Sequence, residues 1–190
     1  MKKKDIKGWR DVSLAIARKL DEIDGDLITQ DVKVVSALLQ LDEDEVWSKP
    51  LDEVNLLTSK IKWVYEGIPD GELTEILFNG MRFVPTTSPD KMTFAQYVDL
   101  QQCLKDVKKY RGEIIAALFV PENGKYNSGY DMEALIRHIY DTVDMTQFKG
   151  FFLSSLKILR TSMKHSMERL RKVNRTIWER METLLDGLGL

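Results

Sequence analysis

The spacing of apolar residues in the last third of the chain limits the possible folds more than any other feature. Between Asp144 and Asp186 these residues recur every three or four positions, and Gly150 is the one glycine or proline in the stretch. Such spacing returns to one side of an α-helix. A helix of this length would extend about 60 Å, which is longer than one compact domain of this size requires. We therefore expect part of it to pack against a partner, with Gly150 either a packing contact or a weak point.

The apolar stripe of this helix supplies the predicted partner-binding residues. It begins at Phe148 and Phe152 and continues to Leu184. The residues expected to contact a partner are Leu156, Leu159, Met163, Leu170, Ile177 and Met181. The partner is either a second copy of the chain or another protein.

The small net charge of −2 conceals an uneven distribution of charge. Residues 157–190 contain eight Arg and Lys against four acidic residues, whereas residues 1–156 contain twenty against twenty-six. A basic segment of this kind favours nucleic acid, an acidic protein, or the acidic part of a neighbouring copy. For nucleic acid, the expected contacts are Lys164, Arg171, Lys172 and Arg175. The simplest alternative is a solvated helix, because these residues do not share one face and no aromatic residues alternate with them.

The composition is that of a soluble globular protein. Hydrophobic residues make up 43% of the chain and charged residues 31%, and no apolar run approaches the roughly eighteen residues that a membrane span requires. Lys2–Lys4 are followed by Asp5, Lys7 and Arg10 rather than by an apolar segment, so we expect no signal peptide. The single cysteine, Cys103, excludes an internal disulfide.

The first third of the sequence predicts four helices. Their expected ranges are 12–23, 31–41, 42–48 and 50–65. The Asp24-Gly25-Asp26 run is expected to stop the first helix, and Pro50 suits the first turn of the fourth. The face of the fourth helix that is expected to pack carries Leu51, Val54, Leu57, Ile61 and Val64.

A β-hairpin is expected where the sequence changes character after Gly67. Asn79-Gly80 separates two short runs of strand-forming residues, 76–78 and 81–84. A two-residue hairpin turn needs positive φ at both positions, which Asn and Gly adopt most readily. An isolated hairpin is only marginally stable in water, so this one must pack on helices or join another sheet.

The second half of the sequence predicts further helices with clear starting signals. Thr93 and Gln96 form a capping box for a helix to about residue 107, and Pro121 ends a helix over 110–120. Residues 122–130 are expected to form a loop with exposed Tyr126 and Tyr130. Asp131 begins a helix to about residue 142, and Asp144 with Gln147 forms a second capping box that opens the long helix.

These elements predict a mainly α protein, a helical bundle with one β-hairpin and a long C-terminal amphipathic helix. The expected segments are an N-terminal helical unit (1–68), the hairpin and linker (69–92), a second helical unit (93–143) and the long basic helix (144–190).

The sequence offers few residues for catalysis or for binding a metal or cofactor. His138 lies three residues before Asp141 on an expected helix, but no nucleophile or further ligand accompanies them. Cys103 lies among apolar residues, where a buried, unreactive thiol is the usual state. No phosphate-binding glycine motif occurs, and Asp21–Val32 lacks the ligand pattern of a calcium loop. We expect no enzymatic activity, metal or cofactor.

Two stretches of the sequence resemble a known class of proteins. The first runs from Val35 through an acidic "DEDE-V" turn to Lys49-Pro50-Leu51, and the second is Lys91–Leu100, with the pattern "MT-x-x-QY-x-DL". A hairpin lies between them, and an "ALFVP" helix and a Tyr-rich loop follow. This order, over about residues 30–153, resembles small virion-morphogenesis proteins of tailed bacteriophages and prophages, including tail assembly chaperones.

The resemblance implies a non-enzymatic protein that acts by contact during particle assembly, and it supplies no catalytic residues. It implies other phage structural or tail proteins as partners, a homo-oligomer, and a place in the host cytoplasm or in the virion. The protein could act as a chaperone or as a structural component of the particle. Both roles remain open, because the basic helix is longer than the resemblance to tail assembly chaperones leads one to expect. The alternative function is a nucleic-acid-binding protein that uses the basic helix.

Overall fold

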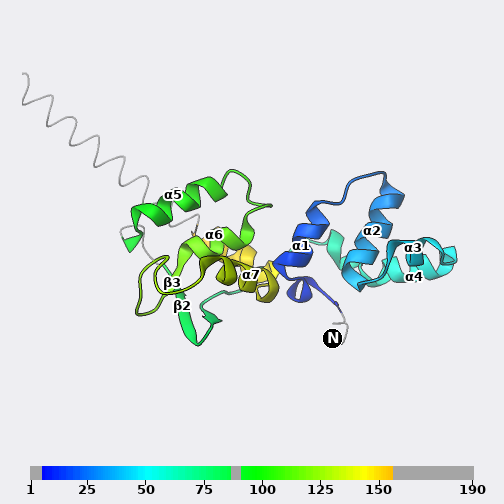
Figure 1. The fold of residues 1–190 in the computed structure, drawn as a ribbon. Coiled ribbons are helices and arrows are strands. Elements are labelled where there is room, and N and C mark those ends of the chain that lie inside the picture. The colour runs from blue at the N-terminus through cyan, green and yellow to red at the C-terminus, as the bar shows by residue number, and fades with distance from the viewer. Residues whose placement is uncertain (1–5, 87–90, 156–190) are drawn as a thin grey trace, which may run out of the picture.

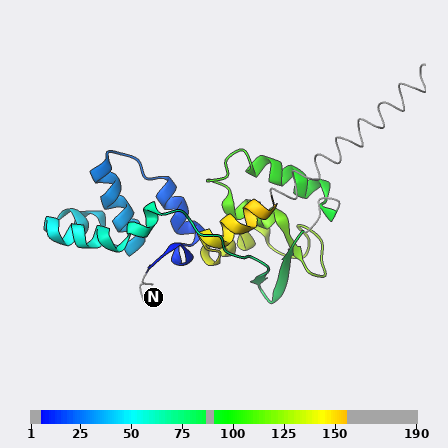
Figure 2. The ribbon, with the colours of Figure 1, turned by 180° about the vertical axis from the view of Figure 1, so that it is seen from behind.

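The computed structural model describes residues 6–86 and 91–155, and this part of the chain is mainly helical (Figure 1). It forms two lobes, with α1 of the first lobe beside α7 of the second (Figures 1 and 2). Most of the long C-terminal helix expected from the sequence lies outside the described residues. The part of it that the structure describes is helical over residues 145–155.

The first lobe contains short helices, as the sequence predicts. They are η1 (Trp9–Asp11), α1 (Leu14–Asp21), α2 (Leu27–Leu39), α3 (Glu43–Trp47), α4 (Leu51–Lys60) and η2 (Lys62–Tyr65). The expected fourth helix is therefore two elements, because the α-helix ends at Lys60 and a 3₁₀ turn replaces its last part.

The start of α2 differs from the sequence prediction. We expected the helix to begin at Asp31, but Asp26 caps it by accepting a hydrogen bond from the Thr29 N–H at 2.9 Å. The Asp24-Gly25-Asp26 run thus separates two helices and also begins the second. A side-chain oxygen that satisfies a free N–H of the first turn stabilises a helix start by about 1 kcal/mol.

The second lobe contains a small sheet and the remaining helices. The strands are β1 (Ile76–Phe78), β2 (Met81–Pro85) and β3 (Phe119–Pro121), and the helices are α5 (Phe94–Cys103), α6 (Arg111–Leu118), α7 (Met132–Thr142) and the segment 145–155. Both predicted capping boxes are present, at Thr93 with Gln96 and at Asp144 with Gln147.

The predicted hairpin is confirmed, and a third strand completes it. Asn79 and Gly80 have φ of 50° and 75°, and Phe78 pairs with Met81 across the turn. β3 then pairs antiparallel with β2, so that Phe83 lies opposite Pro121. The prediction of a helix to Val120 was wrong, because the backbone of Phe119–Pro121 extends and forms ladder hydrogen bonds with β2. The sheet thereby has three strands, and the description of the fold as containing one hairpin alone was incomplete.

The tyrosines of the 122–130 loop are half-buried, not exposed as expected. The Tyr126 hydroxyl donates a 2.7 Å hydrogen bond to Asp99 of α5. The Tyr130 ring packs edge-on against Phe83, with 4.9 Å between ring centroids, and its hydroxyl accepts a hydrogen bond from the Asn127 N–H. A sequence pattern typical of loops does not show that the loop folds back over the sheet.

The linker between the lobes lies directly against the helical segment 145–155. The Gly71 N–H donates to the Thr146 carbonyl oxygen at 2.9 Å, and a Cβ atom at Gly150 would lie 2.0 Å from the Gly71 carbonyl oxygen. Lys149 Nζ binds the Ile68 carbonyl oxygen and lies 3.0 Å from Asp70 Oδ1. Gly150 is therefore a packing contact, the first of its two predicted roles.

We predict that Gly150→Ala destabilises the protein, because the methyl group would displace the linker backbone. The expected loss is about 2–3 kcal/mol of unfolding free energy, measured by urea denaturation. Gly67→Ala is the matched control, since a Cβ atom there meets nothing within 4 Å. Equal unfolding midpoints for the two variants would show that the close contact does not constrain the fold.

Candidate functional site

The residues that the sequence places at a partner or nucleic-acid interface lie outside the part that the structure describes. They are Leu156, Leu159, Met163, Lys164, Leu170, Arg171, Lys172, Arg175, Ile177 and Met181. Their roles stay predictions. Any site within residues 6–86 and 91–155 has to be built from other side chains.

His138 occupies an aromatic environment on α7. Its half-buried ring lies 5.4 Å, centroid to centroid, from the ring of Phe78 on β1. Within the described part of the chain, no set of three His, Cys, Asp or Glu residues has the arrangement of a metal site.

Cys103 lies at the end of α5 and is half-buried. Burial raises the pKa of its thiol to about 11, and the nearby carboxylates of Glu113 and Asp99 act in the same direction. A thiol attacks as its thiolate, so this cysteine is a poor nucleophile at neutral pH.

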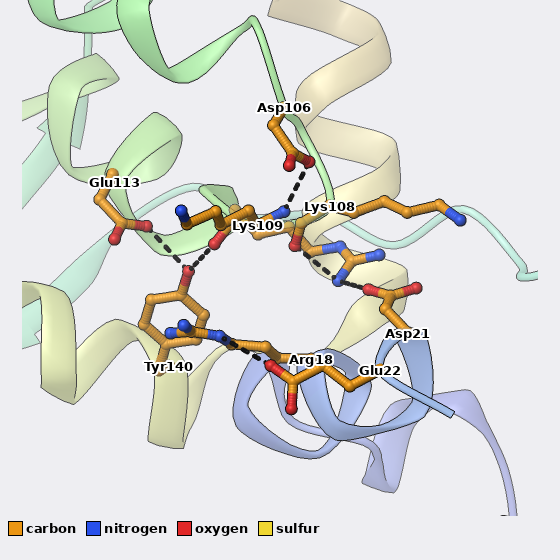
Figure 3. Close-up of polar contacts among 9 residues, drawn as sticks. Arg18, Asp21, Glu22, Asp106, Lys108, Lys109, Glu113 and Tyr140 are labelled. Atoms are coloured by element: carbon orange, nitrogen blue, oxygen red, sulfur yellow. Dashed lines mark hydrogen bonds and ion pairs between the residues drawn. The ribbon is translucent and has the colours of Figure 1, made fainter. Parts of the chain in front are cut away.

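A polar network joins α1 of the first lobe to α6 and α7 of the second (Figure 3). Asp21, the last residue of α1, pairs with Arg111 at the start of α6. The Arg111 side chain is only 8% exposed, and the same Nη1 atom donates to the Lys108 carbonyl oxygen at 3.1 Å. The guanidinium also lies 5.9 Å from the centroid of the Phe148 ring. The buried charge therefore has a carboxylate, a carbonyl and an aromatic ring as partners.

Tyr140 of α7 forms the second half of this network. Its hydroxyl lies 2.8 Å from both the Lys109 carbonyl oxygen and Glu113 Oε2, which share its one proton. Burial raises the pKa of the Tyr140 hydroxyl, and the hydrogen bond to Glu113 raises it further. Gly112 permits the close approach of the ring, since a Cβ atom there would lie 2.5 Å from Tyr140 Cε2.

The chemistry of this network indicates a structural role. Arginine stays protonated in proteins, and the raised pKa keeps the Tyr140 hydroxyl protonated, so neither group exchanges a proton near neutral pH. What the groups do is fix the turn before α6 against α1 and α7. The Tyr140 hydroxyl contacts Lys109 and Glu113 within the second lobe, while the Arg18 guanidinium of α1 lies 6.0 Å from the centroid of the Tyr140 ring. We call the Asp21–Arg111 pair and the Arg18–Tyr140 contact the interlobe latch. Sequence reasoning missed it, since Asp21 and Arg111 are 90 residues apart.

Exposed apolar side chains are the second notable feature of the first lobe. Six large residues there are more than half exposed: Leu27, Ile28, Trp47, Leu51, Leu56 and Tyr65. Isolated exposed apolar residues are common, and Leu77 and Phe94 of the second lobe are also more than half exposed, so these six residues make the first lobe a candidate interaction surface only.

Helix α4 contributes most clearly to this surface, because none of its residues is buried. Leu51 was expected on the packed face, but it is 76% exposed, whereas Ile61 just beyond the helix is fully buried. Burial thus increases along the face from Leu51 to Ile61, which means that α4 packs through its C-terminal end. Leu56, on the outer side of the helix, is 60% exposed.

An open groove of about 710 Å³ lies between α1, α2 and the start of α3. Ile16, Ile23, Ala37 and Leu41 line it, together with side chains of both charges. The Ser36 hydroxyl at its edge is buried and has no hydrogen-bond partner among the described residues. The mixed lining does not select one class of ligand.

Comparison of the chain with protein-family models, with curated proteins and with solved structures gives no match. Among the described residues, no helix is both long and apolar enough to cross a membrane.

We predict that Arg111→Met destabilises the protein, because it leaves the partly buried Asp21 carboxylate without its partner. The expected loss is about 2–3 kcal/mol of unfolding free energy, measured by chemical denaturation. Arg137→Met is the control, since the Arg137–Glu133 pair is exposed and should contribute less than about 0.5 kcal/mol. A double variant with Asp21→Asn should recover part of the loss, and equal effects of the two arginine substitutions would contradict a latch.

We predict slow alkylation of Cys103 by iodoacetamide in the folded protein at pH 7.5. The rate should rise with pH towards the raised pKa of about 11, because only the thiolate reacts. The urea-unfolded chain is the control and should react with a pKa near the ordinary value of about 8.5. Mass spectrometry measures the modified fraction, and equal rates in both states at pH 7.5 would exclude protection by burial.

Proposed function

We propose that this chain is a non-enzymatic bacteriophage protein of virion or tail morphogenesis that acts through protein–protein contacts. The observation that carries the contact part of the proposal is the exposure of large apolar side chains on a lobe of short helices. Leu27 is 81% exposed, Leu51 76% and Ile28 69%. Water contact with these side chains is unfavourable by about 25 cal/mol per Å² of apolar area, so a partner that covers them gains stability.

The assignment to phage assembly comes from the resemblance of two sequence stretches. The first stretch, Val35 to Leu51, forms the end of α2, all of α3 and the start of α4. The second, Lys91 to Leu100, contains the capping box and most of α5. The first stretch therefore lies in the lobe that carries the exposed apolar residues, which supports a role for that lobe in binding.

Two modes of action fit a protein of this class. A structural component would bury its apolar surfaces permanently against neighbouring subunits, as obligate assemblies do. A chaperone would cover an aggregation-prone helix of a client and then release it. The alternative function, nucleic-acid binding through Lys164, Arg171, Lys172 and Arg175, is supported by the basic composition of residues 157–190.

The function is tested by removing the reading frame from the phage or prophage that encodes it. We expect incomplete particles in electron micrographs and a loss of infectious titre of at least about a hundredfold, restored by a plasmid copy. A plasmid copy with Leu51→Ser and Leu56→Ser should restore less, and a copy with Gly67→Ala should restore fully. Normal particles and titre without the reading frame would contradict the proposal.

Peptide mass spectrometry then distinguishes the two modes of action. Many copies in purified particles identify a structural component. Presence in the lysate alone identifies a chaperone.

A further inference from the structure

We propose that the outer surface of α3 and α4 binds the basic C-terminal segment, residues 156–190, of a second copy of the chain. The inference rests on the proposed function, since it specifies which contacts join copies of an assembly protein. We call this surface the α3–α4 face and define it by residues 42–56 that are exposed. Three features of the molecule support this contact: exposed apolar area, uncompensated negative charge, and the positions of the two elements.

The apolar part of the α3–α4 face lies on two successive helices. Trp47 at the end of α3 is 53% exposed, and Leu51 and Leu56 on α4 are 76% and 60% exposed. At 3.6 residues per turn, Leu56 lies on the side of α4 that faces away from Val54 and Leu57, whereas Leu51 lies at the N-terminal end of their face, where the lobe does not cover it. These side chains therefore do not contribute to the core of their own lobe.

The same face carries negative charge that its own lysine only partly offsets. Residues 42–53 contain six acidic residues and one lysine, Lys49. Lys49 Nζ lies 3.4 Å from Glu45 and 3.9 Å from Glu53. The other four acids have no ion-pair partner among the described residues: Asp42, Glu43, Asp44 and Asp52. A partner for this face should combine apolar side chains with positive charge.

Residues 156–190 of the chain have that combination of side chains. Their apolar residues recur at helical spacing, and residues 157–190 contain eight Arg and Lys against four acids. An amphipathic helix that places apolar side chains on a partner surface is a common mode of recognition. Opposite charges around the apolar contact favour association and fix the orientation of the partners.

The arrangement of the lobes favours a contact between copies. The described chain ends at residue 155 in the second lobe, whereas α3 and α4 lie at the far end of the first lobe (Figures 1 and 2). Because the segment starts in one lobe and the face lies at the far end of the other, a contact between copies would join the second lobe of one copy to the first lobe of its neighbour. Such a head-to-tail contact joins unlike surfaces, so it repeats into a ring or a filament.

The proposal is tested by sedimentation velocity of the full-length, nuclease-treated protein. We expect association that depends on protein concentration at about 0.05 M NaCl, with a Kd at least about tenfold weaker at about 0.5 M NaCl, because salt screens the charge contacts. Leu51→Ser with Leu56→Ser should weaken the Kd at least about tenfold at either salt concentration. Both leucines are exposed, so the fold should tolerate these changes.

Charge reversal then identifies the two surfaces that meet. Asp44→Lys with Asp52→Lys should abolish association, and so should Arg171→Glu with Lys172→Glu. A chain that carries all four reversals should associate again, because opposite charges face each other once more. The matched control is Glu72→Lys with Glu133→Lys, an equal charge change on exposed residues away from the α3–α4 face, which should leave association intact. Circular dichroism verifies that each variant is folded.

Three outcomes would overturn the inference: a monomer at all salt concentrations, association that neither reversal changes, or a loss that the fourfold reversal does not restore. If Arg171→Glu with Lys172→Glu removes only binding to a DNA duplex, the basic segment serves the alternative function. If the chain is monomeric but phage assembly fails without it, this inference is contradicted and the proposed function is not. Normal assembly without the chain contradicts the proposed function.

Discussion

The described structure depends on the contact between its first and last segments. The Leu14 N–H donates to the Val143 carbonyl oxygen and the Met145 N–H to the Val12 carbonyl oxygen, each at 3.0 Å. These four side chains are almost fully buried. Each backbone hydrogen bond contributes about 1 kcal/mol and each buried side chain about 2 kcal/mol. Together they offset the entropy lost when segments some 130 residues apart are brought together.

Two other groups of contacts act on the same junction. The interlobe latch joins α1 to α6 and α7, and it places a charged side chain where the apolar contacts leave little water. The Gly71–Gly150 approach holds the linker on the helical segment 145–155. As a result, α1 is fixed against the second lobe, while α3 and α4 extend away from it (Figure 1). Helices α3 and α4 carry the exposed Trp47, Leu51 and Leu56 together with the acidic residues of 42–53.

Much of the local structure could be predicted from the sequence. The hairpin at Asn79-Gly80 and the caps at Thr93, Asp131 and Asp144 depend on residues no more than four apart, and all are present. The start of α2 was misplaced for a local reason as well, because Asp26 was interpreted only as part of a helix stop. The extension of the chain at Phe119 could not be found in this way, since it depends on an unpaired edge of β2 more than thirty residues earlier.

The sequence by itself determined the helices, the turn and the distribution of charge, because these depend on the chain within one or two helical turns. It also determined that residues 157–190 are basic and that residues 42–53 are acidic. Only the tertiary structure decided which apolar residues are covered. Leu51 and Ile61 have the same hydrophobic character and the same place in a helical pattern, yet one is exposed and the other buried. The difference comes from which end of α4 the rest of the lobe covers, and periodicity along one helix carries no information about that.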